Sequence, residues 1–337
     1  MSYFSDVERD LVVADRTEVA AGVVAFDLVA HNGRDLPVWT PGSHVDVVLD
    51  DGRMPGSERV ERQYSLCGDR GDRSRWRIAV LREEEGRGGS VRLHDTVRVG
   101  DRLRVRGPRN HFAFEAAPGT AYRFVAGGIG ITPILPMVHA AAAAGADWTL
   151  DYAGRSRGTM AFSEELVECF GTRVRLHPAD EGERLRVAEL VPALPAGAQV
   201  YACGPARLLD ALDEAIDEAI ETGAGAASVS FHVERFEAVE YGDPVWPEPF
   251  EVELAMSGTT VTVAPEQTVL EAIEQQSPET VVLSSCRRGT CGTCEVPVLE
   301  GEIEHRDSVL TPLEREDSAV MMACVSRAAC PLIVLDL

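Results

Sequence analysis

Four cysteines in the last quarter of the chain have the type and spacing needed to hold an iron–sulfur cluster. Cys286, Cys291 and Cys294 follow the pattern C-x4-C-x2-C, and Cys324 comes after a further 29 residues. Two iron atoms require four converging thiolates, and this spacing supplies three from one tight loop and the fourth from a separate segment. The pattern is typical of a [2Fe–2S] cluster and predicts a carrier of single electrons.

The residues between these cysteines favour the same interpretation. Gly289 and Gly292 predict a loop that adopts positive φ and directs backbone N–H groups toward the cluster sulfurs. A zinc site and a disulfide pair are the alternatives. Structural zinc usually shows two C-x2-C pairs, whereas only Cys291 and Cys294 form one here. Eight cysteines in a chain of this length without a secretion signal favour reduced thiols over a disulfide framework.

Length and charge restrict the class of protein. The chain has 337 residues, enough for two or three domains, and a net charge of −23, which excludes general binding to nucleic acid and disfavours anionic membranes. No apolar run of 18 residues and no signal pattern at the N-terminus is present, so we expect a cytoplasmic protein without a membrane anchor.

The charge is unevenly distributed along the chain. Residues 229–337 carry 20 acidic side chains against 6 arginines, a net charge of −14, which leaves −9 for the first 228 residues. An acidic electron-carrier domain would attract a basic partner protein. An acidic surface that serves only solubility is an equally good explanation.

The order of expected elements indicates three domains. Short β-rich runs separated by Gly, Asp and Pro predict an antiparallel β-barrel in the first hundred residues. The following part alternates strands and helices, as in a doubly wound parallel α/β sheet. The expected runs are 12–13, 23–30, 45–49, 76–81 and 103–105 in the barrel. In the sheet they are strands at 122–126, 148–152, 174–177 and 199–203 and helices at 134–144, 163–169 and 206–221.

A Pro- and acid-rich stretch at 237–249 indicates a linker, followed by a module of ferredoxin size. A hairpin at 250–256 and 259–263 and a helix at 269–275 precede the cysteine loop. We therefore expect a flavin barrel over 1–113, a nucleotide-binding domain over 114–229, a linker over 230–249 and an iron–sulfur domain over 250–337.

Two short motifs in the barrel have the chemistry of a flavin site. Arg62 can pair with a phosphate, Tyr64 can lie on an isoalloxazine ring, and the Ser65 hydroxyl can reach the ring edge. An exposed turn would explain the same few residues. The glycine-rich turn that contains Gly88, Gly89 and Ser90 adds weight, because exposed amides and a hydroxyl make a phosphate cradle.

Two further motifs indicate a dinucleotide site. Residues 126–133, Ala-Gly-Gly-Ile-Gly-Ile-Thr-Pro, join a strand to a helix, where glycines and a helix N-terminus suit a pyrophosphate, although the spacing is not the strict G-x-G-x-x-G. Cys203, Gly204 and Pro205 end a later strand, where such sheets bind ligands. An inert core thiol is the alternative for Cys203.

Taken in order, these motifs resemble the phthalate dioxygenase reductase family over essentially the whole chain. The resemblance includes residues 232–236 (His-Val-Glu-Arg-Phe), 305–311 and 324–327. It implies a flavoprotein reductase of the ferredoxin–NADP reductase type, with a β-grasp ferredoxin domain fused at the C-terminus. FMN, NADH and a [2Fe–2S] cluster would be the cofactors, with NADPH as the alternative to NADH.

The resemblance also implies roles for individual residues. Ser65 and Cys203 would flank the reacting atoms, and Phe236 would cover the flavin face and yield to nicotinamide, although a linker anchor is the alternative for Phe236. The full expected cofactor-binding set is Arg62, Tyr64, Ser65, Leu66, Ala79, Val80, Gly88, Gly89, Ser90, Gly128, Gly130, Thr132, Arg155, Cys203, Gly204, Pro205 and Phe236, and the expected cluster ligands are Cys286, Cys291, Cys294 and Cys324.

The resemblance implies that NADH gives a hydride to FMN, and that electrons then pass singly through the cluster to a separate terminal oxygenase. The chain contains neither a Rieske cysteine–histidine pair nor a haem-thiolate loop, so either class of oxygenase fits, and we expect the chain itself to be a monomer. A free-standing NADH:flavin or O2 reductase, a redox-sensing module, and a reductase running toward NADP are the alternatives. Arg155 and Arg157 would suit a 2′-phosphate in the last case.

Overall fold

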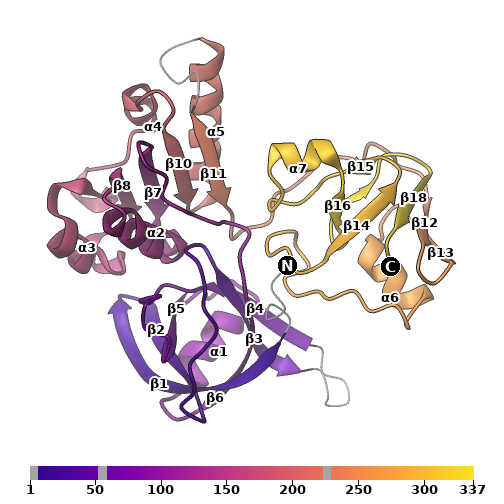
Figure 1. Cartoon of the computed structure of the whole chain (residues 1–337), viewed down its shortest axis with the longest axis horizontal. Coiled ribbons are helices and arrows are strands. Elements are labelled where there is room, and N and C mark those ends of the chain that lie inside the picture. The colour runs from indigo at the N-terminus through magenta and orange to yellow at the C-terminus, as the bar shows by residue number, and fades with distance from the viewer. Residues whose placement is uncertain (1–6, 52–58, 223–228) are drawn as a thin grey trace. The chain divides into compact units, whose positions relative to one another are not determined.

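The structure, a computed structural model, describes residues 7–51, 59–222 and 229–337. It divides into two compact units, Met1–Phe236 and Glu237–Leu337 (Figure 1). Within the described residues, no helix combines the length and apolar character that crossing a membrane requires.

The first unit begins with an antiparallel sheet of six strands in the order β4-β3-β6-β1-β2-β5. Its two edge strands meet where Leu66 bridges Ile78, and the sheet therefore closes into a barrel. In β2, Phe26 and Leu28 fill the barrel, whereas Ala25 on the opposite face packs toward the next domain. The elements are β1 (Glu8–Ala20), β2 (Val23–Ala30), β3 (His44–Asp51), β4 (Arg59–Ser65), β5 (Arg75–Leu81), α1 (Gly89–Thr96) and β6 (Arg102–Arg109).

The second half of this unit is a parallel sheet in the order β11-β10-β7-β8-β9, with helices on both faces. Alternate residues of β7 show why: Phe124 packs with α2, while Val125 packs with α5. The chain winds from β7 to β9 on one side and returns to β10 on the other, so the strand order reverses between β7 and β10. The elements are β7 (Ala121–Gly127), α2 (Ile131–Ala143), β8 (Asp147–Gly154), α3 (Ser163–Phe170), β9 (Val174–Pro178), α4 (Val187–Leu190), β10 (Gln199–Cys203), α5 (Ala206–Glu221) and β11 (Ser230–Glu234).

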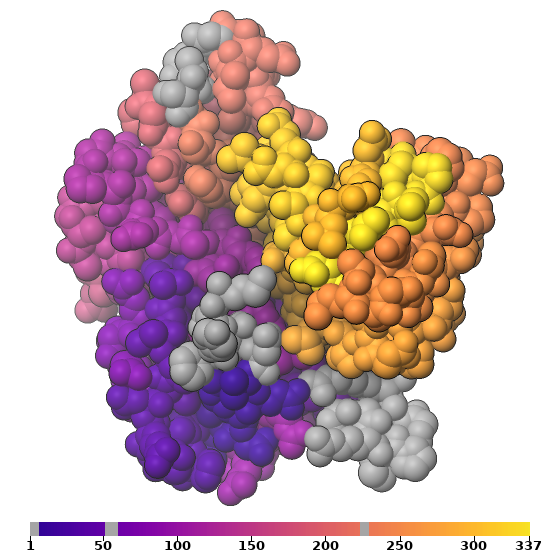
Figure 2. Space-filling model, turned by 45° about the vertical axis from the view of Figure 1, so that its right-hand side comes forward, coloured from indigo at the N-terminus to yellow at the C-terminus, as the bar shows by residue number. Residues whose placement is uncertain are grey.

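The second unit is a mixed sheet in the order β13-β12-β18-β14-β16, covered by α6. Thr268 begins α6 with a reciprocal cap, accepting from Glu271 N–H while the Glu271 carboxylate accepts from Thr268 N–H. Figure 2 shows this unit, orange to yellow, as a closely packed body. The elements are β12 (Phe250–Leu254), β13 (Thr259–Val263), α6 (Val269–Gln276), β14 (Glu295–Glu300), β15 (Ile303–Glu304), α7 (Pro312–Asp317), β16 (Val320–Met322), β17 (Arg327–Ala328) and β18 (Leu332–Leu335).

The predicted fold class is confirmed: an antiparallel barrel, a parallel α/β sheet and a ferredoxin-like mixed sheet follow one another along the chain. One element differs from the expectation. Residues 230–234 fall in the range 230–249 expected to be linker, and the structure places them in β11, where they pair in parallel register with β10. This strand depends on a partner 31 positions earlier in the chain, which a local composition pattern does not reveal.

Candidate functional site

The four cysteines of the C-x4-C-x2-C…C pattern converge in the second unit. Each side chain is at most 3% exposed, and none of the chain's eight cysteines forms a disulfide. Cys286 is hydrogen-bonded to Cys291 and Cys324, and Cys324 also to Cys294. These contacts lower the pKa of Cys286 and raise that of Cys324.

The backbone of the cysteine loop is shaped to face these sulfurs. Gly289 and Gly292 both have φ of 70°, as predicted, and Arg287 has φ of 55°. The N–H groups of Arg288 and Thr290 donate to Cys286 Sγ at 3.3 and 3.5 Å. Buried thiols in mutual contact, with N–H donors on a sulfur, fit a [2Fe–2S] cluster because such donors stabilise its charge.

The segment 305–311 packs against this loop and supports it. A Cβ on Gly289 would lie 2.6 Å from Val325 Cγ2 and 3.1 Å from Asp307 Cα, so only glycine fits. Ser308 N–H donates to Gly289 O at 2.9 Å, and the buried Asp307 carboxylate accepts from two following N–H groups. The 305–311 segment thereby holds the cysteine loop in place.

The residues expected to hold the flavin lie on three neighbouring parts of the barrel. Arg62 on β4 reaches the start of α1, where its Nη2 donates to Arg87 O at 2.9 Å. A Cβ on Gly89 would lie 2.7 Å from Arg62 Cγ, so the guanidinium stem passes directly over this glycine. Tyr64 is mostly buried, which raises its pKa, and Ser65 at the end of β4 is 5% exposed.

The start of α1 is suited to a phosphate. Gly88 precedes the helix at φ 75°, and among the described residues no side chain forms a cap at this helix start. The Ser90 hydroxyl accepts from Glu83 N–H at 3.1 Å and so retains its own hydrogen for an anion. Ala79 and Val80 lie side by side on β5 but face opposite ways: Ala79 packs toward the α/β domain and Val80 into the barrel, as does Leu66.

The two glycine motifs of the α/β domain meet at the carboxyl ends of β7 and β10. Cys203 is in register with Ala126, so the turns that follow lie against each other. A Cβ on Gly130 would lie 2.3 Å from Cys203 O, and one on Gly204 would lie 3.0 Å from Gly127 Cα. This edge is the point where the strand order reverses, the usual ligand site in such sheets.

The expected dinucleotide residues divide into two kinds. Gly128 has φ of 55° and open space beside its Cα, which leaves room for a ligand. Gly130 and Gly204 instead permit the close packing of the two turns. Thr132 is 2% exposed and donates to Ile129 O at 3.0 Å, so its hydroxyl also serves the turn. Pro205 precedes α5.

Glu234 is a half-buried residue at this edge, and the sequence analysis gave it no role although it lies within the quoted residues 232–236. It lies opposite Cys203 in the register of β10 and β11, its Oε2 has no hydrogen-bond partner within the described residues, and burial raises its pKa to about 8. Burial also raises the pKa of the Cys203 thiol. Phe236, two residues beyond β11, has an exposed ring.

Two arginines in the loop that follows β8 lie near acidic side chains of the segment that follows β9. Arg155 is exposed, and Arg157 Nε donates to the two carboxylate oxygens of Glu181 at 2.8 and 3.0 Å. Glu181, Glu183 and Asp180 together raise the pKa of Arg157. Arg157 is thus surrounded by acidic side chains at the position where sheets of this type contact the adenosine ribose.

Comparison with known proteins agrees with this geometry. Residues 252–329 match the family model of the 2Fe-2S iron–sulfur cluster binding domain. The chain is 39% identical over 316 residues to the carnitine monooxygenase reductase subunit of Escherichia coli K12, covering 94% of each.

Two solved structures are similar in fold along the whole chain. Phthalate dioxygenase reductase, described as a modular structure for electron transfer from pyridine nucleotides to [2Fe–2S], superposes with a TM-score of 0.63 at 33% identity, covering 98% of each chain. An intact type IV self-sufficient cytochrome P450 monooxygenase gives a TM-score of 0.87 at 44% identity. The match covers 98% of the present chain but only 41% of that longer chain.

The glycine contact at the β7–β10 edge generates a testable prediction. Gly130→Ala should destabilise the protein by about 1–3 kcal/mol, because the new Cβ collides with backbone atoms that cannot rotate away. It should also slow flavin reduction by NADH. Gly158→Ala is the matched control, since a Cβ there meets nothing within 4 Å. Urea unfolding of the full chain and rapid mixing measure the two effects; equal behaviour of the variants would contradict the packing role.

Proposed function

Because the chain belongs to the phthalate dioxygenase reductase family, we propose that it carries electrons from NADH through FMN and a [2Fe–2S] cluster to a separate terminal oxygenase. It is an NAD(P)H-dependent iron–sulfur flavoprotein oxidoreductase. The observation that carries the proposal is the set of four buried, mutually contacting thiols on the same chain as a flavin barrel and a dinucleotide sheet.

When bound, the flavin accepts a hydride and releases single electrons, which the cluster passes on. The contribution of the chain would be to exclude water from the reacting atoms and to orient the two cofactor rings. Ser65 and Cys203 would lie beside the reacting atoms, where the raised pKa of Cys203 keeps its thiol protonated, so that it provides contact and not a thiolate. Phe236 would cover the flavin, and the N–H groups of Arg288 and Thr290 would stabilise the cluster sulfurs.

The choice of FMN over FAD rests on the start of α1. One terminal phosphate would meet the N–H groups after Gly88, the Ser90 hydroxyl and the Arg62 guanidinium, with Tyr64 and Ala79 on the strands next to it, whereas the side chains of Leu66 and Val80 face the barrel core. NADH is favoured over NADPH because a 2′-phosphate near Arg157 would approach Asp180, Glu181 and Glu183.

The partner is proposed from the relatives. The E. coli relative is named as a reductase subunit of a monooxygenase, and a similar chain forms part of a P450 monooxygenase. In the present chain a separate oxygenase would take the electrons. A free-standing flavin reductase is the second candidate, and in it the cluster would not be required.

Cys291→Ser separates these two functions. It should reduce NADH-dependent cytochrome c reduction to background, because a ligand of the one-electron carrier is lost, while ferricyanide reduction, which draws electrons from flavin, persists. Cys169→Ser, at an exposed thiol of the first unit, is the matched control and should retain both activities. Cytochrome c and oxygenase turnover that survive in Cys291→Ser would favour the free-standing reductase.

The phosphate cradle at the start of α1 predicts which flavin the protein binds. Heat-released flavin from the full chain should run as FMN, one per chain. Arg62→Ala should weaken FMN retention about tenfold to hundredfold, the worth of a charge-assisted hydrogen bond. Arg92→Ala, at an exposed position of α1, should leave FMN retention unchanged. Chromatography against standards and a dilution series measure this, and release of FAD would overturn the assignment.

Cofactor preference should depend on the acidic side chains after β9. Glu181→Arg should raise the ratio of NADPH to NADH kcat/KM by about tenfold, because it removes the carboxylate that neutralises Arg157 and adds a second cation. Glu189→Arg, at an exposed carboxylate paired with Arg186, is the control for added charge. An unchanged ratio in Glu181→Arg would place the ribose elsewhere.

A further inference from the structure

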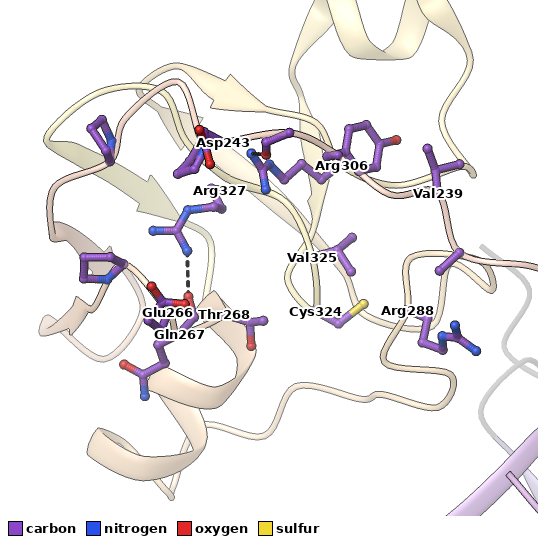
Figure 3. Close-up of a pocket in the computed structure, with 16 residues that line it drawn as sticks. Val239, Asp243, Glu266, Gln267, Thr268, Arg288, Arg306, Cys324, Val325 and Arg327 are labelled. Carbon is purple, nitrogen blue, oxygen red and sulfur yellow. Dashed lines mark hydrogen bonds between the residues drawn. The ribbon is translucent and has the colours of Figure 1, made fainter.

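A hollow of about 930 Å³ lies within the second unit (Figure 3). Residues of the 238–247 stretch form one wall, and residues 265–268 at the start of α6 form another. The cluster ligand Cys324 lies between them. The charged side chains that line the hollow are Asp243, Glu266, Arg288, Arg306 and Arg327.

This hollow collects the basic side chains of an acidic unit. Residues 237–337 contain 19 acidic residues and five arginines, and three of the five line this one hollow. The other two are directed elsewhere: Arg287 pairs with Glu274, and Arg315 donates to the backbone oxygens of Asp307 and Leu310. The surface is therefore acidic overall and basic at this point.

Arg327 is the most enclosed of the three. It is 6% exposed, its guanidinium lies 5.2 Å from the Phe250 ring, and Nη1 donates to Gln267 O at 2.8 Å. Its Nε and Nη2 are buried, and within the described residues they have no acceptor. A guanidinium carries five N–H donors. When burial removes its water and leaves a single carbonyl as acceptor, most of these donors lack a hydrogen bond.

Arg306 and Arg288 complete the basic lining in different ways. Arg306 donates to Gly242 O and Glu304, and so fastens the 238–247 stretch to the body of the unit. Arg288 is exposed, and Figure 3 shows it on the opposite side of Cys324 from Arg327. A group that enters between them would lie against a ligand of the cluster.

We propose that this hollow receives a carboxylate side chain of the terminal oxygenase and thereby docks the acceptor beside Cys324. The inference rests on the proposed function. A planar guanidinium with unsatisfied N–H groups matches a carboxylate in geometry as well as charge. Because Nε and Nη2 are enclosed, the carboxylate displaces part of the lining when it pairs with Arg327.

The charge pattern selects the partner surface. The acidic composition of the unit attracts a basic face, whereas the three arginines of the hollow outnumber Asp243 and Glu266 there and favour an acid over a lysine or arginine. The complementary surface is therefore basic with one aspartate or glutamate in the middle. Such a reversed pattern discriminates against proteins that are merely basic.

The first test uses the full-length holoprotein and glutarate as the probe, with neutral glutaramide of the same shape as the control ligand. Calorimetry should detect glutarate but not glutaramide. Glutarate binding should weaken about tenfold or more in Arg327→Gln and partly return in Arg327→Lys. Arg287→Gln removes one arginine of the same unit outside the hollow and should still bind. Equal binding by all variants would overturn the site.

The second test asks whether the carboxylate comes from the partner. With the oxygenase that accepts electrons from this chain, Arg327→Gln should raise the KM for oxygenase about tenfold, while cytochrome c reduction by the same preparation stays unchanged. Arg288→Gln, at an exposed position, should act in the same direction if Arg327→Gln fails to fold. Glutarate binding without a change in KM would reveal a small-anion site and overturn the docking role. If the wild-type protein did not reduce cytochrome c with NADH, that result would instead contradict the proposed function.

Discussion

The second unit depends on the convergence of four thiols in a space closed to water. Thiolates brought this close repel one another, so the surrounding backbone has to supply N–H donors and a rigid frame. The cysteine loop meets this demand with successive positive-φ positions, and Gly289 packs against Val325 and Asp307 without room for a Cβ. Ala323 N–H donates to Cys294 O at 3.1 Å, which ties the distant fourth ligand to the loop that carries the other three.

A comparable constraint organises the α/β half of the first unit. Glycines at the ends of β7 and β10 let two turns approach until backbone touches backbone, and this contact fixes the edge where the strand order reverses. The same edge is nearly free of charge. With a pKa of about 8, Glu234 is mainly protonated at neutral pH, and the neighbouring Cys203 thiol is neutral as well. The absence of charge on these two groups suits a reduced nicotinamide ring, which is itself uncharged.

The features that the sequence reveals are those that local patterns encode. The bounds of β2, β10 and α5 agree with the expected 23–30, 199–203 and 206–221, because hydrophobic periodicity and turn residues define them locally. The cysteine loop could be predicted equally well from the sequence, since three expected ligands lie within nine residues. Strand β11, Glu234 and the basic hollow are not, because each arises from residues brought together over long separations; Arg327, for example, meets Gln267 across 60 positions.

Buried charge is treated differently in the two units. In the first, two buried carboxylates are matched by guanidinium groups: Asp27 by Arg75 and Arg77, and Asp46 by Arg106 and Arg109. Burial raises the pKa of Asp27, but the hydrogen bonds from Arg77 and Arg75 outweigh it and the pKa is lowered. In the second unit Arg327 is enclosed, and a carbonyl is its one hydrogen-bond acceptor among the residues that the structure describes. A chain with 55 acidic residues does not lack carboxylates, so the missing acceptor at Arg327 points to one supplied from outside.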